Sequence, residues 1–339
     1  MIRPCFRFID TARLICYNTA EKSADYPLFN RTRSGAKKGL PQMKKMLSLL
    51  LLCVLLLPCL SVAAEENADP YALPLDIKTG GFKPDPACIT EDGYQDESLT
   101  IHKETRRYNN VTFHLVWVQI KSPTQLRTAV AGKPNETVTA KPSRMARKLN
   151  AVFACNGEFY VQRTRDIFVY RQGVMYRNEP DPIKDVLIID EKGDFHIFTS
   201  ENKKADIEAY LENGGTIVNA FSFGPALIVD GVEQDVHEFH LFDGLRPLPR
   251  TVIAQVDELS YVFVRCEGRK NTSRGCNHQQ MADFMNTLNV RHAYNLDGGQ
   301  SSVLILNGKY ADDTTSSSER DQSDIIYVVS AVDPDKKGQ

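Results

Sequence analysis

The sequence predicts an α+β fold with a mixed, largely antiparallel β-sheet core, few helices, and active-site loops at the ends of strands. Three observations support this prediction. Short apolar stretches rich in β-branched and aromatic residues recur after residue 110, several of them separated by glycine-containing turns. Only one stretch has clear helical periodicity. Strands and helices do not alternate regularly, which favours an α+β domain.

The composition is that of an ordinary globular protein, since 42% of the 339 residues are hydrophobic and 25% are charged. The net charge of −2 conceals an asymmetry. Residues 1–64 hold ten Lys and Arg and three Asp and Glu, which leaves 31 basic and 40 acidic residues, a net charge of −9. No long basic run follows residue 64, so we expect no binding to nucleic acid, which requires clustered Lys and Arg.

Residues 43–64 have the layout of a secretion signal. A short basic start (Met43-Lys44-Lys45-Met46) precedes the apolar run Leu47–Leu57 and the small residues 61–64. The run is short for a membrane span, which requires about 20 residues. A retained N-terminal anchor is the alternative, and Cys59 loosely suggests an acylated lipoprotein cysteine. We expect a secreted, periplasmic or cell-envelope protein that meets the membrane only through this segment or anchor.

The rest of the chain divides into three segments on this interpretation. Residues 1–42 have no consistent period, and translation starting at Met43 would explain them as upstream sequence included by mistake. Residues 65–105 are expected to form a lead-in or linker, because the stretch to about Thr100 is rich in Pro, Asp and Gly. Residues 106–332 are expected to form the folded domain.

Four cysteines follow the signal, namely Cys88, Cys155, Cys266 and Cys276. An even number in an exported chain is compatible with disulfides. Cys266 and Cys276 flank a loop and could bridge, although their spacing alone leaves this open. No CxxC pair occurs, so we expect no zinc site built from these cysteines.

The first clear strand is Val111–Ile120, which is rich in β-branched and aromatic residues. We expect Gln125–Val130 to be its partner, because the turn residues Ser122 and Pro123 separate the two. A short helix is predicted over Pro142–Leu149, followed by the apolar run Ala151–Cys155. Further strands are predicted over Ile167–Tyr170, Val186–Asp190, Phe195–Thr199, Ala226–Val229, Val252–Gln255, Tyr261–Cys266, Ala293–Leu296, Ser302–Leu306 and Ile325–Val329.

The clearest helix is predicted over Asn277–Asn289. Its residues Met281, Phe284, Met285 and Leu288 recur at helical spacing and form one apolar stripe. Such a stripe is typical of core packing, and we assign it no other role.

Four polar, glycine-marked segments each adjoin an apolar stretch, where a rigid scaffold presents functional groups on loops. The first, Asn156-Gly157-Glu158, places a carboxylate after a turn dipeptide. A hairpin turn with a solvated Glu158 is the alternative. The second is Phe223-Gly224-Pro225, where proline removes a ladder donor. It suggests a bent entry into a strand that lines a cleft, although structural need alone could explain it.

The third segment combines Arg250-Thr251 with a strand that ends at Glu267-Gly268-Arg269 and is followed by Ser273-Arg274-Gly275. Arg250 and Arg269 could each present a planar fork to a phosphate, which lysine does less well. Arginine is abundant on protein surfaces, so either residue alone could equally be an ordinary surface residue.

The fourth segment runs from Asn295 to Ser302 (NLDGGQSS). Its glycines, Gly298 and Gly299, allow the backbone to approach a ligand closely, and Asp297 supplies an acid or base. A calcium loop is an alternative, because Asp and backbone carbonyls are hard oxygen ligands, but the alternating carboxylates of an EF-hand are missing. We expect no required cofactor and leave open a divalent cation, Ca²⁺ or Mg²⁺.

Together and in this order, these segments resemble the phosphodiester glycosidase family. That family includes the animal enzyme that removes N-acetylglucosamine from mannose 6-phosphate diesters, and exported bacterial relatives. The resemblance covers about residues 110–331, includes the late run Ser318–Tyr327, and implies a phosphodiester glycosidase-like domain over residues 106–332. Glu267 stands where members typically have Asp, Gln300 where Gly is usual, and Val256-Asp257 where a Gly is often kept. Glu267 keeps a carboxylate, but its side chain is one methylene longer than that of Asp. A displacement of about 1 Å can disable catalysis, so this difference bears directly on activity.

The resemblance implies hydrolysis of the bond between a sugar anomeric carbon and a phosphodiester. Asp297, with Glu158 or Glu267, would act on water or on the sugar, and Arg250 and Arg269 would hold the phosphate. The expected substrate-binding residues are Asn156, Gly157, Arg250, Thr251, Arg269, Ser273, Asn295, Gly298, Gly299 and Ser301.

The expected partner is a sugar-phosphate or polysaccharide substrate. One alternative is a non-catalytic module that binds polysaccharide or sugar phosphate of the cell envelope. The other is an ordinary glycoside hydrolase, for which loss of Arg250 should matter little.

Overall fold

The computed structural model describes residues 69–75, 80–133, 136–160, 167–239, 241–312 and 319–336. The chain separates into two units, Met1–Glu66 and Asn67–Gln339, and all described residues belong to the second. The upstream segment and the signal expected over residues 1–64 therefore lie outside the described residues. Within these ranges no helix has both the length and the apolar character that crossing a bilayer requires.

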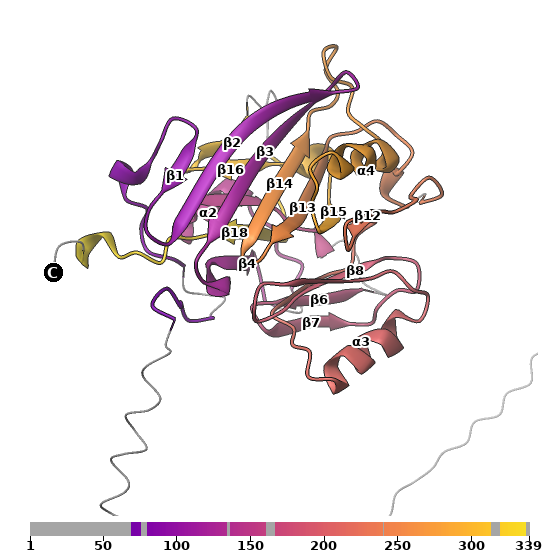
Figure 1. Cartoon of the computed structure of the whole chain (residues 1–339), viewed down its shortest axis with the longest axis horizontal. Coiled ribbons are helices and arrows are strands. Elements are labelled where there is room, and N and C mark those ends of the chain that lie inside the picture. Colours follow the sequence, from indigo (N-terminus) through magenta and orange to yellow (C-terminus); the bar gives the residue numbers. More distant parts are fainter. Residues whose placement is uncertain are drawn as a thin grey trace, which may run out of the picture. The chain divides into compact units, whose positions relative to one another are not determined.

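The largest element is an eight-stranded antiparallel sheet, here called sheet 1 (Figure 1). Its strand order is β1-β2-β3-β14-β13-β15-β11-β12. The β2–β3 hairpin turns at Asn109 and Asn110, which both have positive φ, as a two-residue turn of this kind requires. The strands are β1 (Gly93–Gln95), β2 (Leu99–Tyr108), β3 (Val111–Ile120), β11 (Ala226–Val229), β12 (Val232–Glu233), β13 (Arg250–Asp257), β14 (Ser260–Cys266) and β15 (His292–Leu296).

Two five-stranded antiparallel sheets complete the strand framework. Sheet 2 has the order β17-β16-β5-β18-β4, and sheet 3 has the order β7-β6-β10-β8-β9. Sheet 2 consists of β4 (Leu126–Val130), β5 (Phe153–Asn156), β16 (Leu304–Leu306), β17 (Lys309–Tyr310) and β18 (Asp324–Val328). Sheet 3 consists of β6 (Phe168–Arg171), β7 (Val174–Asn178), β8 (Val186–Ile189), β9 (Phe195–Phe198) and β10 (Asn219–Phe221).

Three α-helices lie in the described part of the chain: α2 (Pro142–Lys148), α3 (Lys203–Glu212) and α4 (His278–Asn286). Helix α4 begins with a capping box, in which Gln280 N donates to Asn277 Oδ1 at 2.8 Å and Asn277 N donates to Gln280 Oε1 at 3.1 Å. Short 3₁₀ turns are η1 (Pro86–Cys88), η2 (Pro123–Gln125), η4 (Leu241–Asp243), η5 (Gly299–Ser301) and η6 (Pro334–Lys336).

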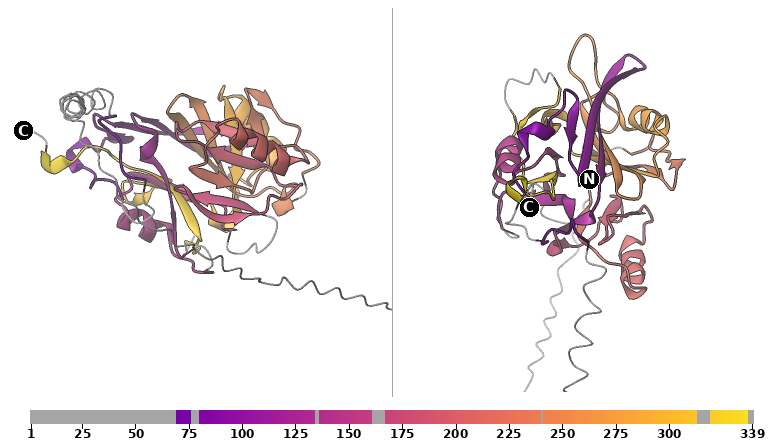
Figure 2. Two further views of the ribbon diagram at one scale, coloured as in Figure 1. Left: turned by 90° about the horizontal axis from the view of Figure 1, so that it is seen from below. Right: turned by 60° about the vertical axis from the view of Figure 1, so that its left-hand side comes forward.

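The core is layered, with sheets 1 and 2 packed face to face between α4 and α2 (Figure 2). Successive residues of β14 show this directly. Phe263 packs between the sheets, 4.7 Å from the ring of Phe153 on β5, whereas Val262 and Val264 face α4. Both faces of these strands are buried, which explains why they read as nearly continuous apolar runs. The stripe of α4 packs as predicted, and Phe284 stacks on Phe113 at 3.7 Å.

The predicted fold class, an α+β domain with a largely antiparallel core, is confirmed. Two expectations are wrong. The stretch expected as a lead-in up to residue 105 already belongs to sheet 1 from Gly93 onward, because β2 pairs with β3 along its whole length. The stretch expected to pair with β3 is β4, which instead pairs with β18 in sheet 2. Strands β1, β2, β7, β10, β12 and β17 and helix α3 were not predicted.

Candidate active site

The predicted site segments meet at Asn156, the last residue of β5. Its side chain is fully buried, and its Nδ2 donates to the backbone oxygen of Asp297 at 2.7 Å. Its Oδ1 accepts from Thr251 Oγ1 at 3.0 Å and from Val303 N at 3.1 Å. The first, third and fourth segments are therefore joined through one amide.

The second segment joins this group through Asn295, which lies on β15. Asn295 Nδ2 donates to Gly224 O at 2.8 Å, and Asn295 N donates to Pro225 O at 3.1 Å. The Gly224–Pro225 peptide bond is cis. All four sequence motifs thus converge on one place, at adjoining ends of strands from the three sheets.

Glycines are required where two of these loops rest on Pro249. A Cβ atom on Gly298 would lie 2.6 Å from Pro249 O, and one on Gly268 would lie 2.6 Å from Pro249 Cδ. Gly299, at φ 61°, donates its N–H to the same Pro249 oxygen at 2.7 Å. Only residues without a side chain allow this approach.

Most predicted site residues are buried beneath the surface that these loops form. Asn156, Gly157, Glu158, Arg250, Thr251, Glu267, Ser273, Asn295 and Ser301 are buried. Arg269 is exposed, and Asp297, Gly298 and Gly299 are partly exposed. The exposed residues are the ones that a substrate could contact. The buried residues lie behind them and support their loops.

The accessible carboxylate of the group is that of Asp297. It follows the end of β15, its Oδ1 accepts from Gly298 N at 2.9 Å, and its backbone N donates to Gly157 O at 3.4 Å. The carboxylate is held at a fixed place by the turn that leads into η5. No group of three or more His, Cys, Asp or Glu suited to a metal ion occurs among the residues that the structure describes.

Two arginines flank the Gly298–Ser301 turn. Arg269 Nη2 lies 3.4 Å from the place that a Cβ atom of Gly299 would take. Arg320 Nη1 donates to Ser301 Oγ at 3.2 Å, and its guanidinium lies 4.6 Å from the ring centre of Phe159. Two arginine side chains therefore lie beside this turn.

Arg250 lies elsewhere than predicted. Its side chain is 2% exposed, and its guanidinium donates to the backbone oxygens of Asp243 at 2.7 Å, Arg246 at 3.0 Å and Cys276 at 3.3 Å. This placement disagrees with a direct contact between Arg250 and a phosphate. Arg250 instead fixes the loops behind Asp297.

Glu158 also lies behind the loops and stabilises them. It is 1% exposed, its Oε1 accepts from Arg171 Nη2 at 2.8 Å, and its Oε2 accepts from Ser222 N at 2.8 Å. Arg171 also donates to Asp324 Oδ2 at 2.7 Å, and Asp324 in turn accepts from Phe159 N at 3.2 Å. Neither a solvated Glu158 nor a catalytic one fits this buried charge cluster of Glu158, Arg171 and Asp324.

Glu267 is held by Lys270 and His114. Its Oε1 accepts from Lys270 Nζ at 2.8 Å and lies 3.2 Å from His114 Nε2. Burial alone would raise the pKa of Glu267, but the hydrogen bonds from Lys270 and His114 outweigh it and lower the pKa below its ordinary value. Ser273 is buried, and its Oγ accepts from Thr112 N at 3.1 Å, so it anchors the same loop to β3.

His278 packs behind Asn295 and is held uncharged. Its Nε2 lies 3.4 Å from Asn295 Nδ2, and its side chain is 1% exposed. Burial, and secondarily the nearby charge of Arg250, lower the pKa of His278 to about 2. A neutral ring at this place adds no charge behind the Asp297 loop.

A family comparison matches this part of the chain. The family model described as phosphodiester glycosidase matches residues 149–329, which contain every predicted site residue and more than half of the chain. The chain belongs to the phosphodiester glycosidase family.

Solved structures support the fold of this phosphodiester glycosidase. The catalytic domain of zebrafish N-acetylglucosamine-1-phosphodiester alpha-N-acetylglucosaminidase, in a form auto-inhibited by its pro-peptide, superposes with a TM-score of 0.54 at 19% identity. That match covers 70% of this chain and 86% of the zebrafish one. A hypothetical protein from Synechocystis gives a TM-score of 0.55 at 15% identity, over 68% of this chain and 62% of the other.

A curated relative matches only part of the glycosidase. The SPbeta prophage-derived uncharacterized protein YomE of Bacillus subtilis (strain 168) is 26% identical over 127 residues, which is 38% of this chain. The match spans only 19% of the length of that relative.

Two residues at this site of the glycosidase were missed from the sequence. Arg171 follows a predicted strand and precedes Gln172-Gly173, so it reads as a turn residue. Arg320 lies in the late run that resembles the family, but it was given no role there. The run itself was the available signal, because Arg320 is its single cation and stands just before β18.

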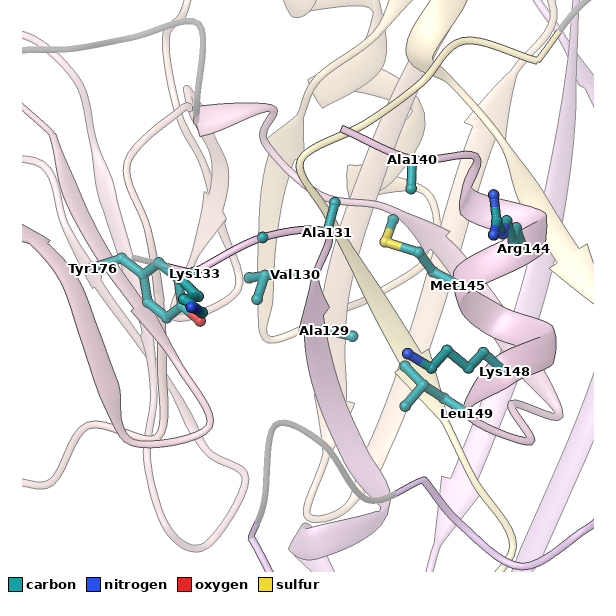
Figure 3. A pocket seen from close by; sticks show the side chains of 11 residues that line it. Ala129, Val130, Ala131, Lys133, Ala140, Arg144, Met145, Lys148, Leu149 and Tyr176 are labelled. Carbon is teal, nitrogen blue, oxygen red and sulfur yellow. The ribbon is translucent and has the colours of Figure 1, made fainter. Parts of the chain in front are cut away.

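A pocket of about 380 Å³ lies between β4, α2 and β7 (Figure 3). Its floor is apolar and includes Ala129, Met145 and Leu149, with Tyr176 at the opposite side. Lys133, Arg144 and Lys148 also line it. None of the predicted site residues lines this pocket.

Proposed function

We propose that this phosphodiester glycosidase is an exported hydrolase that cleaves the bond between a sugar anomeric carbon and a phosphodiester. The observation that carries the proposal is the hydrogen-bonded junction at Asn156, which brings Asp297 and the glycine turns together. Export is inferred from the signal-like layout of residues 43–64.

Asp297 is the residue that we assign to the reacting centre. Glycosidases use carboxylates to activate water or to attack the anomeric carbon, and Asp297 is the partly exposed carboxylate of the converged motifs. A departing phosphate monoester already leaves readily, so charge stabilisation matters more than protonation of the leaving oxygen. Glu267 has its Oε1 engaged by Lys270 and His114, and we give it a supporting role in the loop that carries Arg269.

Arg269 and Arg320 are the residues that we assign to the phosphate. Each lies beside a residue of the Gly298–Ser301 turn, and a guanidinium fork matches the geometry of phosphate oxygens. Arg250 is not assigned to this task, because its donors are directed to backbone oxygens.

Release of free sugar from a sugar-1-phosphodiester tests the proposal. The first probe is the methyl phosphodiester of N-acetyl-α-glucosamine 1-phosphate, followed by the corresponding glucose and galactose compounds, with free sugar measured by chromatography. Asp297→Asn should lower turnover by a factor on the order of 10³ or more and leave the melting temperature unchanged. Glu258→Gln, which changes an exposed carboxylate on the β13–β14 turn, should retain full activity. Unchanged turnover in Asp297→Asn would remove it from the reacting centre.

Variants of the two arginines distinguish a phosphodiester glycosidase from an ordinary glycoside hydrolase. A hydrogen bond to a charged group contributes about 1.5–3 kcal/mol, so Arg269→Met and Arg320→Met should each lower kcat/KM for the diester about 10- to 150-fold. The exposed neighbour Arg274 provides the control Arg274→Met. If both site variants hydrolysed the diester normally, the assignment would be wrong. Equal losses on an aryl glycoside of the same sugar would show that the arginines do not read the phosphate.

The same panel addresses the non-catalytic alternative. The observation that favours this alternative is that Glu267, which replaces the usual Asp, is engaged by Lys270 and His114. Saturable binding of the diesters by the wild-type chain, with no sugar released from any of them, would favour a module that binds envelope polysaccharide or sugar phosphate.

A further inference from the structure

Two cysteine sulfurs lie almost in bonding contact behind the Arg269 loop. Cys266 is the last residue of β14, and Cys276 lies two residues before α4. Their Sγ atoms are 3.1 Å apart, and both side chains are fully buried. A disulfide requires about 2.05 Å between the sulfurs, so the two need to approach by only about 1 Å.

The surrounding backbone fixes this pairing. Arg250 N donates to Cys266 Sγ at 3.2 Å, and Leu248 forms a bridge with Cys276 through hydrogen bonds of 3.2 Å in both directions. Both cysteines are therefore anchored to the same stretch of chain, just before and at the start of β13.

We propose that Cys266 and Cys276 form a disulfide in oxidising surroundings, and that this bond closes the base of the loop formed by residues 267–275. The two cysteines stand immediately before and after that loop. Its own backbone hydrogen bonds are few: Arg269 N donates to Arg274 O at 3.3 Å, and Lys270 and Ser273 are paired at 3.1 and 3.2 Å. A covalent bond at the base would hold Arg269 beside Gly299.

The oxidant of this reaction is a disulfide, either a small one such as oxidised glutathione or that of an oxidoreductase. The Cys266 thiolate attacks one sulfur of the oxidant and expels the first thiolate. The Cys276 thiolate then attacks the Cys266 sulfur and expels the second. The protein loses two electrons and two protons, and the oxidant leaves as two thiols.

Cys266 is the better nucleophile of the pair. Burial alone would raise the pKa of its thiol, but the hydrogen bonds from the Cys276 thiol and from the Arg250 N–H lower the pKa below its ordinary value. Burial and the neighbouring Cys266 raise the pKa of Cys276. Because both sulfurs are buried, exchange with the oxidant requires the loop to open first or the bond to form during folding.

Peptide mapping of the full chain tests bond formation without any activity assay. The protein is incubated with oxidised glutathione, denatured, blocked with N-ethylmaleimide and digested with trypsin. Cleavage after Arg265, Arg269, Arg274 and Arg291 would leave the cysteines on two separate peptides, 266–269 and 275–291. We expect these peptides to be linked, and to separate and become labelled only when dithiothreitol precedes blocking. Full labelling of both cysteines without reductant would overturn the proposal.

Thermal unfolding and limited proteolysis test whether the disulfide stabilises the loop of residues 267–275. Reduction should lower the melting temperature of the wild type by about 5–10 °C, the effect expected from reopening a ring of about ten residues. It should also speed tryptic cleavage at Lys270 and Arg274. Cys266→Ala/Cys276→Ala should be insensitive to reductant, whereas the control Cys155→Ala, on β5, should stay sensitive. If the two cysteines are linked but reduction changes neither the melting temperature nor the rate of cleavage, the disulfide does not stabilise the loop.

The consequence for catalysis rests on the proposed function. Reduction should raise KM for the phosphodiester several-fold through Arg269, with a smaller effect on kcat. A chain that shows the linked peptides but no turnover would refute the proposed function and leave the disulfide standing.

Discussion

Replacing Arg171 with methionine tests the buried charge cluster beneath the candidate site. The Arg171 guanidinium is fully buried and donates to Glu158 at 2.8 Å and to Asp324 at 2.7 and 3.2 Å. It also lies 4.1 Å from the ring centre of Phe221. Methionine fills much of the same space but carries neither the charge nor the donors. Two buried carboxylates then remain without their cation.

The expected loss of stability is large. Breaking a buried ion pair by removing one partner costs about 3–5 kcal/mol, because the remaining charge stays buried. Arg171 neutralises one carboxylate and donates to both, so we expect at least about 4 kcal/mol at pH 7. A domain is stable by only about 5–15 kcal/mol. The variant should therefore melt about 10 °C or more below the wild type.

The loss should become smaller as the pH falls toward 5. In the variant the two carboxylates are buried without a cation, and burial without a compensating charge favours the protonated form of a carboxyl group. The folded variant then binds more protons than its unfolded state, so its stability rises as the pH falls. In the wild type Arg171 supplies a compensating charge, so the difference in stability between the two proteins should shrink.

Urea unfolding at pH 5, 6, 7 and 8 measures the effect. The control Arg147→Met changes an exposed arginine in the last turn of α2 and should stay within about 0.5 kcal/mol of the wild type. The triple variant Glu158→Gln/Arg171→Met/Asp324→Asn should recover a good part of the loss, because no buried charge remains. A loss below about 1 kcal/mol at pH 7, or one of equal size at pH 5 and pH 8, would refute the reasoning.

Three further predictions concern the same surroundings. Gly157→Ala should lower the free energy of unfolding by about 1–3 kcal/mol and lower kcat/KM, because the added Cβ atom would lie 2.1 Å from Asp324 Oδ2. An unchanged melting temperature would contradict this. Burial raises the pKa of Asp185, below the Gly224 turn, to about 6, so its folded form favours the proton and its contribution to stability falls as the pH rises from about 4 to 6. Asp185→Asn should gain stability over the wild type across that window, which melting curves at pH 4, 5, 6 and 7 would show. The His278 ring, with its pKa lowered to about 2 by burial and Arg250, should show no imidazole titration by NMR between pH 4.5 and 8, and a midpoint near 6.5 would contradict the placement.

Local patterns were sufficient to predict the strands and the amphipathic helix. Val111–Ile120 and Ala226–Val229 were predicted with the bounds that β3 and β11 have, because apolar content and turn residues are properties of neighbouring positions. The stripe of α4 was equally local. Helix α3 was missed because it has no such stripe: its buried residues are Lys203 and Ile207, and Lys203 donates to the oxygens of Pro182 and Ser200.

Strand pairing failed where the partner is distant in sequence. Gln125–Val130 follows β3 closely, and neighbouring strands often pair, but the carbonyls and amides of β4 bond to β18, nearly 200 residues later. The pairing of two such distant segments depends on which of their faces are buried when sheet 2 packs against sheet 1. The lead-in was misjudged for a related reason, since β2 has mostly polar residues and becomes a strand by pairing with β3.

The same reasoning explains which site residues could be predicted. The loops that the motifs mark meet in the structure, and they could be recognised because glycines and a carboxylate at a strand end are local features. The assignment of roles within the loops required knowing which side chains are buried. Glu158 and Arg250 have the chemistry of catalytic and phosphate-binding residues, yet Glu158 faces Arg171 and Arg250 faces backbone oxygens. Each is buried beside a group that satisfies it, which is the condition for burying a charge at tolerable cost. Asp297, Arg269 and Arg320 are at least partly exposed at this place, and the phosphodiester assay tests these three side chains.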